Sequence, residues 1–568
     1  MKFSEMPYVR PDLEQVREEG TAYVQALINA ADFAQADAAF HQYSDMGDRV
    51  STAVTLVSIR HSINTEDAFY AKEQEVLDEM MPLLQQLDAE FNKALYNSKF
   101  RPQFTEKYGE LLFTNLGIQL RAFDEKLIPD MQEENKLVTA YNKLIASAQI
   151  PFEGQVLTLS QLSPYMQSAD DALRHKAWEA NNAFFDAHKQ ELDDIYDKLT
   201  ALRTGMGRKL GYDNYIPLGY DRMNRNCYGE KDVDSFRQAV VKYVVPVADK
   251  LYRQQAERTS LPYPLSYKDA SLMFRSGNPV PQGDAEDILR EGRAFYHWLS
   301  PEAGEFIDCM FDNELMDVLS RKGKESGGYC TSLPVYKCPF IFANFNGTQH
   351  DVEVVTHEAG HAFADWTNRK RIPSSYIWPT LEGCEVHSMS MEFFAWPWAE
   401  GFFGPDTRKF LYSHLAGALT FIPYGTMVDH FQHIVYEKPD MTPAERNAAW
   451  KELTGLYMPW VKMDDSEIPF YTEGRRWQRQ HHIYSSPFYY IDYCLAQPVA
   501  LEIWALLQKD RKEAWERYMA YTRQGGSEVF TTLLKNAGLE SPFDEECLHT
   551  VCETAKNWLD NYDLTGIE

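Results

Sequence analysis

Residues 351–366 read DVEVVTHEAGHAFADW and contain an H-E-x-x-H motif at His357, Glu358 and His361. On a helix, two histidines four residues apart project about 40° from each other on one face, so both imidazoles can reach one Zn²⁺ ion. Glu358 lies between them angularly and can act as a general base toward an attacking water. The alternative is a helix with two solvated or structural histidines. We favour the first interpretation, in which one helical turn supplies two ligands and a base.

A zinc enzyme also needs a third protein ligand and an open position for water. The helical stretch LEGCEVHSMSMEFFAW at residues 381–396 carries Glu385 and Glu392 seven residues apart on one face, with Glu382 beside them. A carboxylate from this helix, facing the histidine pair, would complete a two-histidine, one-glutamate site. Sequence spacing alone does not choose among the three acids, each of which could instead be a solvated surface charge.

The sequence HEAGHAF, followed 24 residues after its second histidine by EVHSMSME, resembles the M3 metallopeptidases, the family of thimet oligopeptidase and oligoendopeptidase F. That family has H-E-x-G-H and then a ligand glutamate that opens an E-x-x-S-x-x-x-E stretch. The resemblance implies that Glu385 is the third ligand and that Glu392 supports the site from outside the ligand set. It also implies one Zn²⁺ ion per chain as the cofactor.

A third stretch, GRRWQRQHHIYSSPFYYIDYCLAQP at residues 474–498, gathers His482, Tyr489 and Tyr493 in a polar, aromatic cluster. Peptide hydrolysis builds negative charge on the former carbonyl oxygen, which phenol or imidazole donors stabilise by roughly 3 kcal/mol each. Aromatic core packing is the alternative for any single tyrosine. The stretch resembles the oligoendopeptidase F pattern H-x-x-x-P-F-Y-x-Y-x-Y, with one extra serine and a different spacing of the last tyrosines. We expect Tyr493 to bind the oxyanion, with Tyr489 as the second choice and His482 as a further donor.

Most of the first 320 residues follow the 3.6-residue period of amphipathic helices, as in residues 75–91, although Pro82 weakens the local prediction. Short strand-like segments occur at residues 150–159 and 335–348. We therefore predict a mostly α protein with a small β-sheet element near the zinc site. Residues 335–348, together with residues 327–329, could form an exposed edge to which a peptide adds as a strand, with a buried hairpin strand as the alternative.

Composition excludes several classes of protein. The 568 residues include 84 Asp and Glu against 56 Lys and Arg, a net charge of -28, which disfavours nucleic acid and acidic partners. The sequence has no apolar run long enough to span a membrane and no signal-peptide core at its start. The eight cysteines form no C-x-x-C pair, which argues against a disulfide framework and a thiolate metal site. A cytoplasmic protein that does not bind membranes fits these features best.

The M3 resemblance extends from about residue 165 to the C-terminus. It implies a zincin fold of the gluzincin type, in which two helical lobes enclose a deep substrate channel with zinc on its wall. Residues 1–165 would form an N-terminal helical lobe, and residues 166–568 an M3-like catalytic region that contributes to both lobes. Such a recessed site admits short, flexible peptides and excludes folded proteins. The sequence does not indicate an oligomeric state.

These features predict a zinc-dependent oligoendopeptidase that cuts internal bonds of short peptides. A zinc exopeptidase of the same helical fold, a peptidyl dipeptidase or a carboxypeptidase, is the main alternative. The sequence contains neither the G-x-M-E-N motif of zinc aminopeptidases nor the H-E-S-Q stretch of related carboxypeptidases. A non-catalytic peptide-binding protein would have a damaged site, whereas His357, Glu358, His361 and Glu385 are all present.

Overall fold

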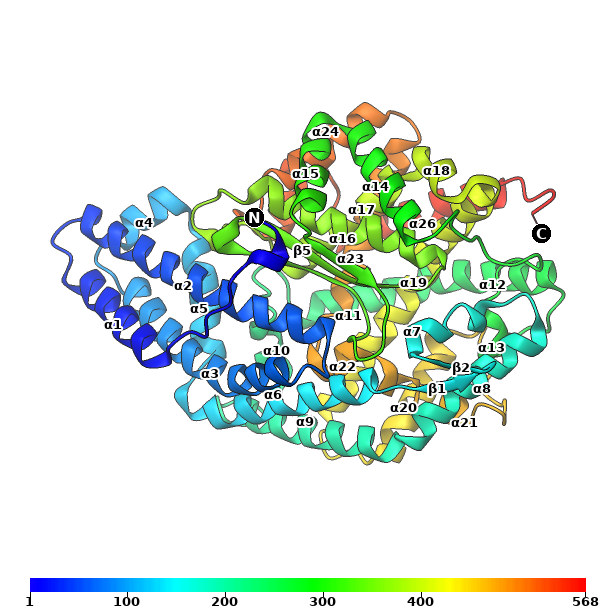
Figure 1. The fold of residues 1–568 in the computed structure, drawn as a ribbon, viewed down its shortest axis with the longest axis horizontal. Helices are drawn as coiled ribbons and strands as arrows, with labels where there is room; N and C mark the ends of the chain where they lie inside the picture. The colour runs from blue at the N-terminus through cyan, green and yellow to red at the C-terminus, as the bar shows by residue number, and fades with distance from the viewer. Residues whose placement is uncertain (568) are drawn as a thin grey trace.

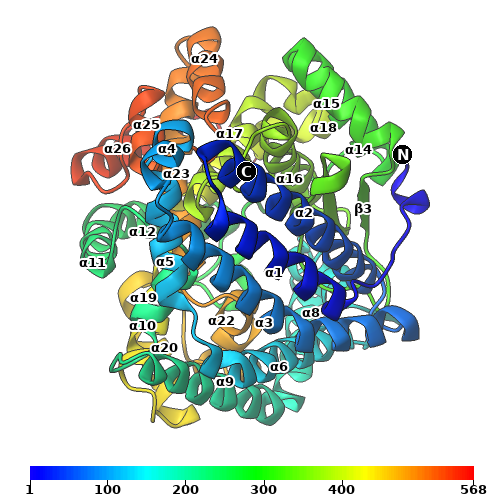
Figure 2. The same cartoon turned by 90° about the vertical axis from the view of Figure 1, so that its left-hand side faces the viewer.

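The helical periodicity of the sequence appears as helices along almost the whole chain (Figure 1), and the mostly α prediction is confirmed. The computed structural model describes residues 1–567. The first of its helices gather on the left of Figure 1, the side that faces the viewer in Figure 2, and α6 runs from there along the bottom toward the middle. They are α1 (Leu13–Asn29), α2 (Phe33–Ile63), α3 (Ala68–Tyr96), α4 (Arg101–Tyr108), α5 (Leu111–Ala122) and α6 (Ile128–Ala146).

Two hydrophobic cores hold the described residues together. The smaller core is built by α1 to α5 and includes Phe40 and Phe91, while the larger one spans the rest of the chain. Helix α2 contributes to both, because Val57 belongs to the smaller core while its neighbour Leu56 belongs to the larger one. The N-terminal helices are thus fastened to the remainder along α2. The division at residue 165 stays a prediction.

Pro82 does not interrupt its helix, contrary to the doubt that the sequence raised there. It is buried inside α3, which continues to Tyr96. The apolar face of α3, with Leu77, Leu84 and Leu87, is buried against the smaller core. Burial of this face outweighs the hydrogen bond that proline removes from a helix.

The middle of the chain continues the helical arrangement and leads into the sheet. Its helices are α7 (Leu159–Leu162), α8 (Asp171–Ala187), α9 (Lys189–Lys209), α10 (Ile216–Arg222), α11 (Glu230–Ala239), α12 (Val245–Thr259), α13 (Tyr267–Ala270), α14 (Ala285–Leu299) and α15 (Pro301–Asp312).

Both strand-like segments of the sequence are strands, and the structure has two small sheets. Strands β1 (Ile150–Phe152) and β2 (Gln155–Leu157) form an antiparallel hairpin. Strands β3 (Met316–Leu319), β4 (Tyr329–Leu333) and β5 (Cys338–Phe345) form a sheet in the order β3-β5-β4. Because β5 is the central, almost wholly buried strand, the prediction that its segment offers an exposed edge is wrong. The edge strand beside β5 is β4, which begins at Tyr329, directly after residues 327–328.

The C-terminal half surrounds one buried helix. Helix α17 (Leu381–Phe394) packs against both α16 (Gln349–Asn368) and α23 (Ile491–Leu507), near the centre of Figure 1. The remaining helices are α18 (Ala399–Phe403), α19 (Thr407–Glu437), α20 (Pro443–Tyr457), α21 (Pro469–Thr472), α22 (His481–Ser485), α24 (Arg511–Thr522), α25 (Phe530–Asn536) and α26 (Glu545–Asp560). None of the described helices has the length and apolarity needed to cross a bilayer. All eight cysteines are free thiols.

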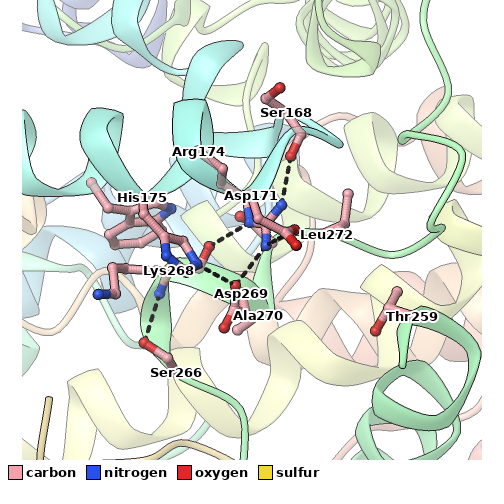
Figure 3. Close-up of polar contacts among 12 residues, drawn as sticks. Ser168, Asp171, Arg174, His175, Thr259, Ser266, Lys268, Asp269, Ala270 and Leu272 are labelled. Atoms are coloured by element: carbon pink, nitrogen blue, oxygen red, sulfur yellow. Dashed lines mark hydrogen bonds and ion pairs between the residues drawn. The ribbon is translucent and has the colours of Figure 1, made fainter. Parts of the chain in front are cut away.

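A buried arginine ties α8 to α13 (Figure 3). The guanidinium of Arg174, which is 0% exposed, donates to the carbonyl oxygens of Lys268 at 3.0 Å and Ser168 at 2.8 Å. It also donates to the carboxylates of Asp269 at 2.6 Å and Asp171 at 2.8 Å. A buried charge that satisfies four acceptors is costly to remove: the carbonyl oxygens of Lys268 and Ser168 lose this donor, and Asp269 keeps only His175 as a partner.

We predict that Arg174→Met lowers the free energy of unfolding by about 3–5 kcal/mol, because it leaves buried acceptors unpaired. Arg275→Met is the matched control, since Arg275 also binds Asp171, at 2.7 and 2.9 Å, but on the surface. The control should cost less than about 1 kcal/mol. Urea denaturation followed by circular dichroism measures both. Equal losses in the two variants would contradict the structural role given to Arg174.

Candidate metal centre and active site

The position of α16 is set where it leaves the sheet. Strand β5 ends in a turn at Asn346 and Gly347, and Gly347 has a φ of 85°, a conformation that favours glycine. The carboxylate of Asp351, in the first turn of α16, accepts hydrogen bonds from the backbone N–H groups of Asn346 at 2.9 Å and Gly347 at 2.7 Å. A negative charge is favourable at this end of a helix. The turn therefore fixes the start of the helix that carries the H-E-x-x-H motif.

Three of the predicted side chains meet around one point. His357 and His361 of α16 and Glu385 of α17 each offer one ligand atom, and these atoms all lie within 4.8 Å of one another. The Nε2 atoms of His357 and His361 lie 3.3 and 3.2 Å from the same oxygen, Oε2 of Glu385. Two imidazole nitrogens and a carboxylate oxygen are a donor set that zinc takes in catalytic sites.

The other two acids of α17 lie elsewhere. Glu382 is 1% exposed, accepts a hydrogen bond from the Thr380 hydroxyl and is not part of the three-residue group. Glu392 contacts His357 from behind, with Oε1 at 2.6 Å from Nδ1. The contacts thus distinguish the three acids: of these, only Glu385 lies at the point where the two histidines meet.

Gly360 allows α16 and α17 to approach each other closely. A Cβ atom at this position would lie 2.8 Å from Cα of Ser388 and 2.9 Å from the carbonyl oxygen of His387, both in α17. Real Cβ atoms do not come that close to backbone, so any larger residue would push the helices apart. The glycine between the two histidines therefore controls how near Glu385 comes to them.

The charges and hydrogen bonds around Glu385 fit a bound cation. Burial raises the pKa of its carboxyl group, but His361 and His357 outweigh this effect and hold the pKa well below its usual value. Its oxygens also accept hydrogen bonds, Oε2 from the Ser388 hydroxyl at 2.9 Å and Oε1 from the Tyr489 hydroxyl at 2.6 Å. An ionised carboxylate held in this way beside two imidazoles is suited to a divalent metal ion.

A hydrogen-bonded chain supports His357 on the side away from Glu385. Glu392 accepts from both sides, with Oε1 at 2.6 Å from His357 Nδ1 and Oε2 at 2.8 Å from His414 Nε2. The indole N–H of Trp396 donates to His414 Nδ1 at 3.0 Å. Burial raises the pKa of Glu392, but His357 and His414 outweigh it and lower the pKa to about 2. Such a carboxylate orients the histidine and leaves its Nε2 lone pair facing the metal position.

Glu358 lies beside the group, since the charges of His357, His361 and Glu385 all act on its carboxyl group. It is 8% exposed, and burial raises the pKa of its carboxyl group. Gly328, just before β4, lies next to it, since a Cβ atom there would be 3.4 Å from Glu358 Oε1. A carboxylate whose pKa is raised in this way is closer to the range in which it can both take and return a proton.

The hydroxyl groups of Tyr489 and Tyr493 have different hydrogen-bond partners. The hydroxyl of Tyr489 donates to the predicted ligand Glu385, whereas that of Tyr493 lies 3.2 Å from His482 Nε2. The rings of Tyr489 and Tyr493 are 5.0 Å apart, and all three side chains are half-buried. Tyr493 is therefore the tyrosine left to contact a bound molecule, while Tyr489 is engaged with Glu385.

Sequence reasoning missed three residues of this site: Ser388, His414 and Trp396. Ser388 lies three residues after Glu385, and the E-x-x-S pattern was a usable signal for its hydrogen bond to that carboxylate. His414 and Trp396 gave no local signal, because their contacts with Glu392 and with each other come from the packing of α19 against α17 and the segment after it.

Two cavities lie near α16, and none of the three candidate ligands lines either of them. One, of about 430 Å³, is lined by Glu353 and His350 of α16, which lie one and two turns before His357. Another, of about 480 Å³, is lined by residues of α2, α3 and α5 and by Trp378, whose ring lies 6.3 Å from that of His361. Each is large enough to hold amino-acid side chains of a ligand.

Comparisons with known proteins identify the family of the chain. Residues 3–123 match the model of the peptidase M3 N-terminal domain, and residues 305–552 match that of peptidase family M3. Oligopeptidase PepF of Bacillus subtilis is 24% identical over 301 residues, 51% of this chain and 43% of that protein. The chain therefore matches less than half the length of this curated relative.

Two solved structures match almost completely. A protein assigned as an oligoendopeptidase F is 46% identical with a TM-score of 0.98, over 99% of both chains. PZ peptidase A with an inhibitor is 44% identical with a TM-score of 0.97, over 99% of this chain and 100% of that one. The chain therefore belongs to peptidase family M3, in its oligoendopeptidase F group.

Proposed function

We propose that this protein is a zinc-dependent oligoendopeptidase that hydrolyses internal bonds of short, unstructured peptides. The observation that carries the proposal is the convergence of His357, His361 and Glu385 on one point, with Glu358 close enough to feel the charges of all three. Membership of a metallopeptidase family supports the same reading.

His357, His361 and Glu385 would hold the zinc ion, one per chain. When bound, zinc acts as a Lewis acid toward the scissile carbonyl group and lowers the pKa of water. Neutral imidazole and carboxylate ligands favour zinc over calcium or magnesium, which prefer oxygen ligands alone. Glu392 and His414 would keep His357 in the tautomer with a hydrogen on Nδ1 and a free lone pair on Nε2.

Glu358 is the proposed general base. It accepts a proton from the attacking water and returns it to the amine that leaves. Its raised pKa, caused by burial, suits both halves of this transfer. Gly328 lies directly beside the carboxylate, where a Cβ atom would be 3.4 Å from Glu358 Oε1.

Tyr493 is the proposed donor to the oxyanion, and His482 supports it, with Nε2 at 3.2 Å from the Tyr493 hydroxyl. Burial, with a further contribution from the charge of Glu385, raises the pKa of the Tyr493 hydroxyl well above its usual value, so that it stays a hydrogen donor. Tyr489 takes a different role in this proposal than the sequence suggested. Its hydroxyl holds Glu385 in place.

A peptide with an acetylated N-terminus, an amidated C-terminus and an internal quenched fluorophore tests the reaction class. The wild-type protein should cut it at an internal bond, as mass spectrometry of the products would reveal. Glu358→Gln should keep its zinc and lose about 10²–10⁴-fold in kcat/KM, because only the base is removed. Cleavage that requires a free terminus would favour the exopeptidase alternative, and a zinc-replete Glu358→Gln protein with wild-type activity would refute the proposal.

Gly360→Ala should weaken zinc binding by roughly 10- to 100-fold, because the added methyl group moves α17 and with it Glu385. Competition with a chromophoric chelator measures the zinc Kd. Gly205→Ala in α9 is the control, since a Cβ atom there meets nothing within 4 Å. The control should bind zinc as the wild type does. An unchanged Kd in Gly360→Ala would show that the approach of the helices does not set the ligand geometry.

Phenylalanine substitutions of Tyr493 and Tyr489 should have different effects on kinetics and on metal binding. Tyr493→Phe should lower kcat by about 10²–10³-fold with nearly unchanged KM and zinc Kd, because it removes a hydrogen bond made in the transition state. Tyr489→Phe should mainly weaken zinc binding, because it frees Glu385. The reverse pattern, with Tyr489→Phe affecting kcat alone, would exchange the two roles.

A further inference from the structure

A chain of four side chains runs along the wall of the site and ends at Tyr493. The Tyr424 hydroxyl of α19 donates to Gln480 Oε1 at 2.6 Å. Gln480 Nε2 lies 3.1 Å from His482 Nδ1, and His482 Nε2 lies 3.2 Å from the Tyr493 hydroxyl. Tyr424 and Gln480 are half-buried and take no part in the reaction as proposed above.

The distances fix which way the Gln480 amide points. A separation of 2.6 Å is typical of an O–H···O bond, whereas 3.1 Å suits an N–H donor. The amide oxygen therefore faces Tyr424, and the amide nitrogen faces His482. An amide nitrogen has hydrogens and no lone pair to offer, so it can only donate. His482 Nδ1 must consequently be the acceptor and carry no hydrogen.

The neutral ring then has its single hydrogen on Nε2. Burial lowers the pKa of His482 to about 3, so the ring stays neutral at physiological pH. An Nε2–H group donates to the oxygen of Tyr493, so His482 does not take up the Tyr493 hydroxyl hydrogen, which can turn from the neighbouring Tyr489 hydroxyl to a ligand. In the other tautomer Nε2 would accept that hydrogen, and Tyr493 would no longer have one to offer to a ligand.

We propose that Gln480 is a positioning residue that holds His482 as its Nε2–H tautomer and thereby leaves the hydroxyl hydrogen of Tyr493 free for the carbonyl oxygen of the scissile bond. The inference rests on the proposed function, because it assigns Tyr493 to the oxyanion. Gln480 acts through His482 and touches no reacting atom. Tyr424 supports it by occupying the amide oxygen.

Gln480 is not needed to hold the His482 ring in place. The ring is surrounded by those of Tyr490, Tyr489 and Tyr493, with centroids 4.9, 5.4 and 5.7 Å away. These contacts restrain the ring plane whichever nitrogen carries the hydrogen. The contribution of Gln480 is therefore the placement of a hydrogen atom rather than of a side chain.

Gln480→Glu replaces the hydrogen-bond donor that faces His482 by an acceptor and leaves the shape of the side chain almost unchanged. A carboxylate only accepts hydrogen bonds, so it requires a hydrogen on His482 Nδ1. Gln480→Met has the same length but neither donates nor accepts, and it serves as the control for lost contacts. NMR of protein labelled with ¹⁵N-histidine reads the tautomer directly, with the His482 signal assigned by its loss in His482→Gln.

We expect the wild-type signal to show a neutral ring with its hydrogen on Nε2. At a pH where the spectra show a neutral His482, Gln480→Glu should carry the hydrogen on Nδ1 and lose about 10- to 100-fold in kcat, with KM and zinc Kd unchanged. Gln480→Met should lose less. Combined with Tyr493→Phe, Gln480→Glu should cause no further loss, because Gln480 acts only through the Tyr493 hydroxyl.

A wild-type His482 with its hydrogen on Nδ1 would overturn the inference whatever the kinetics. So would additive effects of Gln480→Glu and Tyr493→Phe, which are the mark of a purely structural role. Failure of the proposed function has a different signature: Tyr493→Phe alone would then retain wild-type kcat. The tautomer measurement does not depend on activity and keeps the two failures apart.

Discussion

The close packing of α16 against α17 at Gly360 is the constraint on which the site depends. The three predicted ligands come from two helices, and only their separation decides whether Glu385 reaches both histidines. The contact distances at Gly360 leave no room for a side chain. Helix α17 is in turn almost completely buried between α16 and α23. Movement of Glu385 away from the histidines would therefore require repacking of the core.

The groups around these ligands are held by hydrogen bonds in which the carboxylates accept and their neighbours donate. Glu385 accepts from Ser388 and Tyr489, and Glu392 accepts from His357 and His414. Each buried carboxylate is thus ionised and fully partnered, which offsets the cost of removing its charge from water. Donor-only groups fix the histidines: the Trp396 indole sets the hydrogen position of His414, as the Gln480 amide does for His482.

The local parts of this arrangement could be predicted from the sequence, whereas the contacts between distant segments could not. The spacing of His357 and His361 determines their common face on any helix, and resemblance to a family selected Glu385. The contact between Tyr489 and Glu385 could be predicted neither from residue spacing nor from the resemblance. Its hydroxyl reaches Glu385 only because the segment before α23 packs onto α17, 104 residues away in sequence. The burial of β5 escaped prediction for a similar reason, since strand order is set by β3.

The tyrosines also depend on a strained residue that the core holds in place. Phe488, directly before Tyr489, has a φ of 68°, which bulky side chains rarely adopt. Its N–H donates to Gln432 at 3.0 Å, its carbonyl oxygen accepts from Arg225, and its ring is 0% exposed. Strain of this kind persists only where surrounding contacts over-determine the backbone. Those contacts turn the chain sharply at Phe488, so that its own ring enters the core while the rings of the next residues line the site.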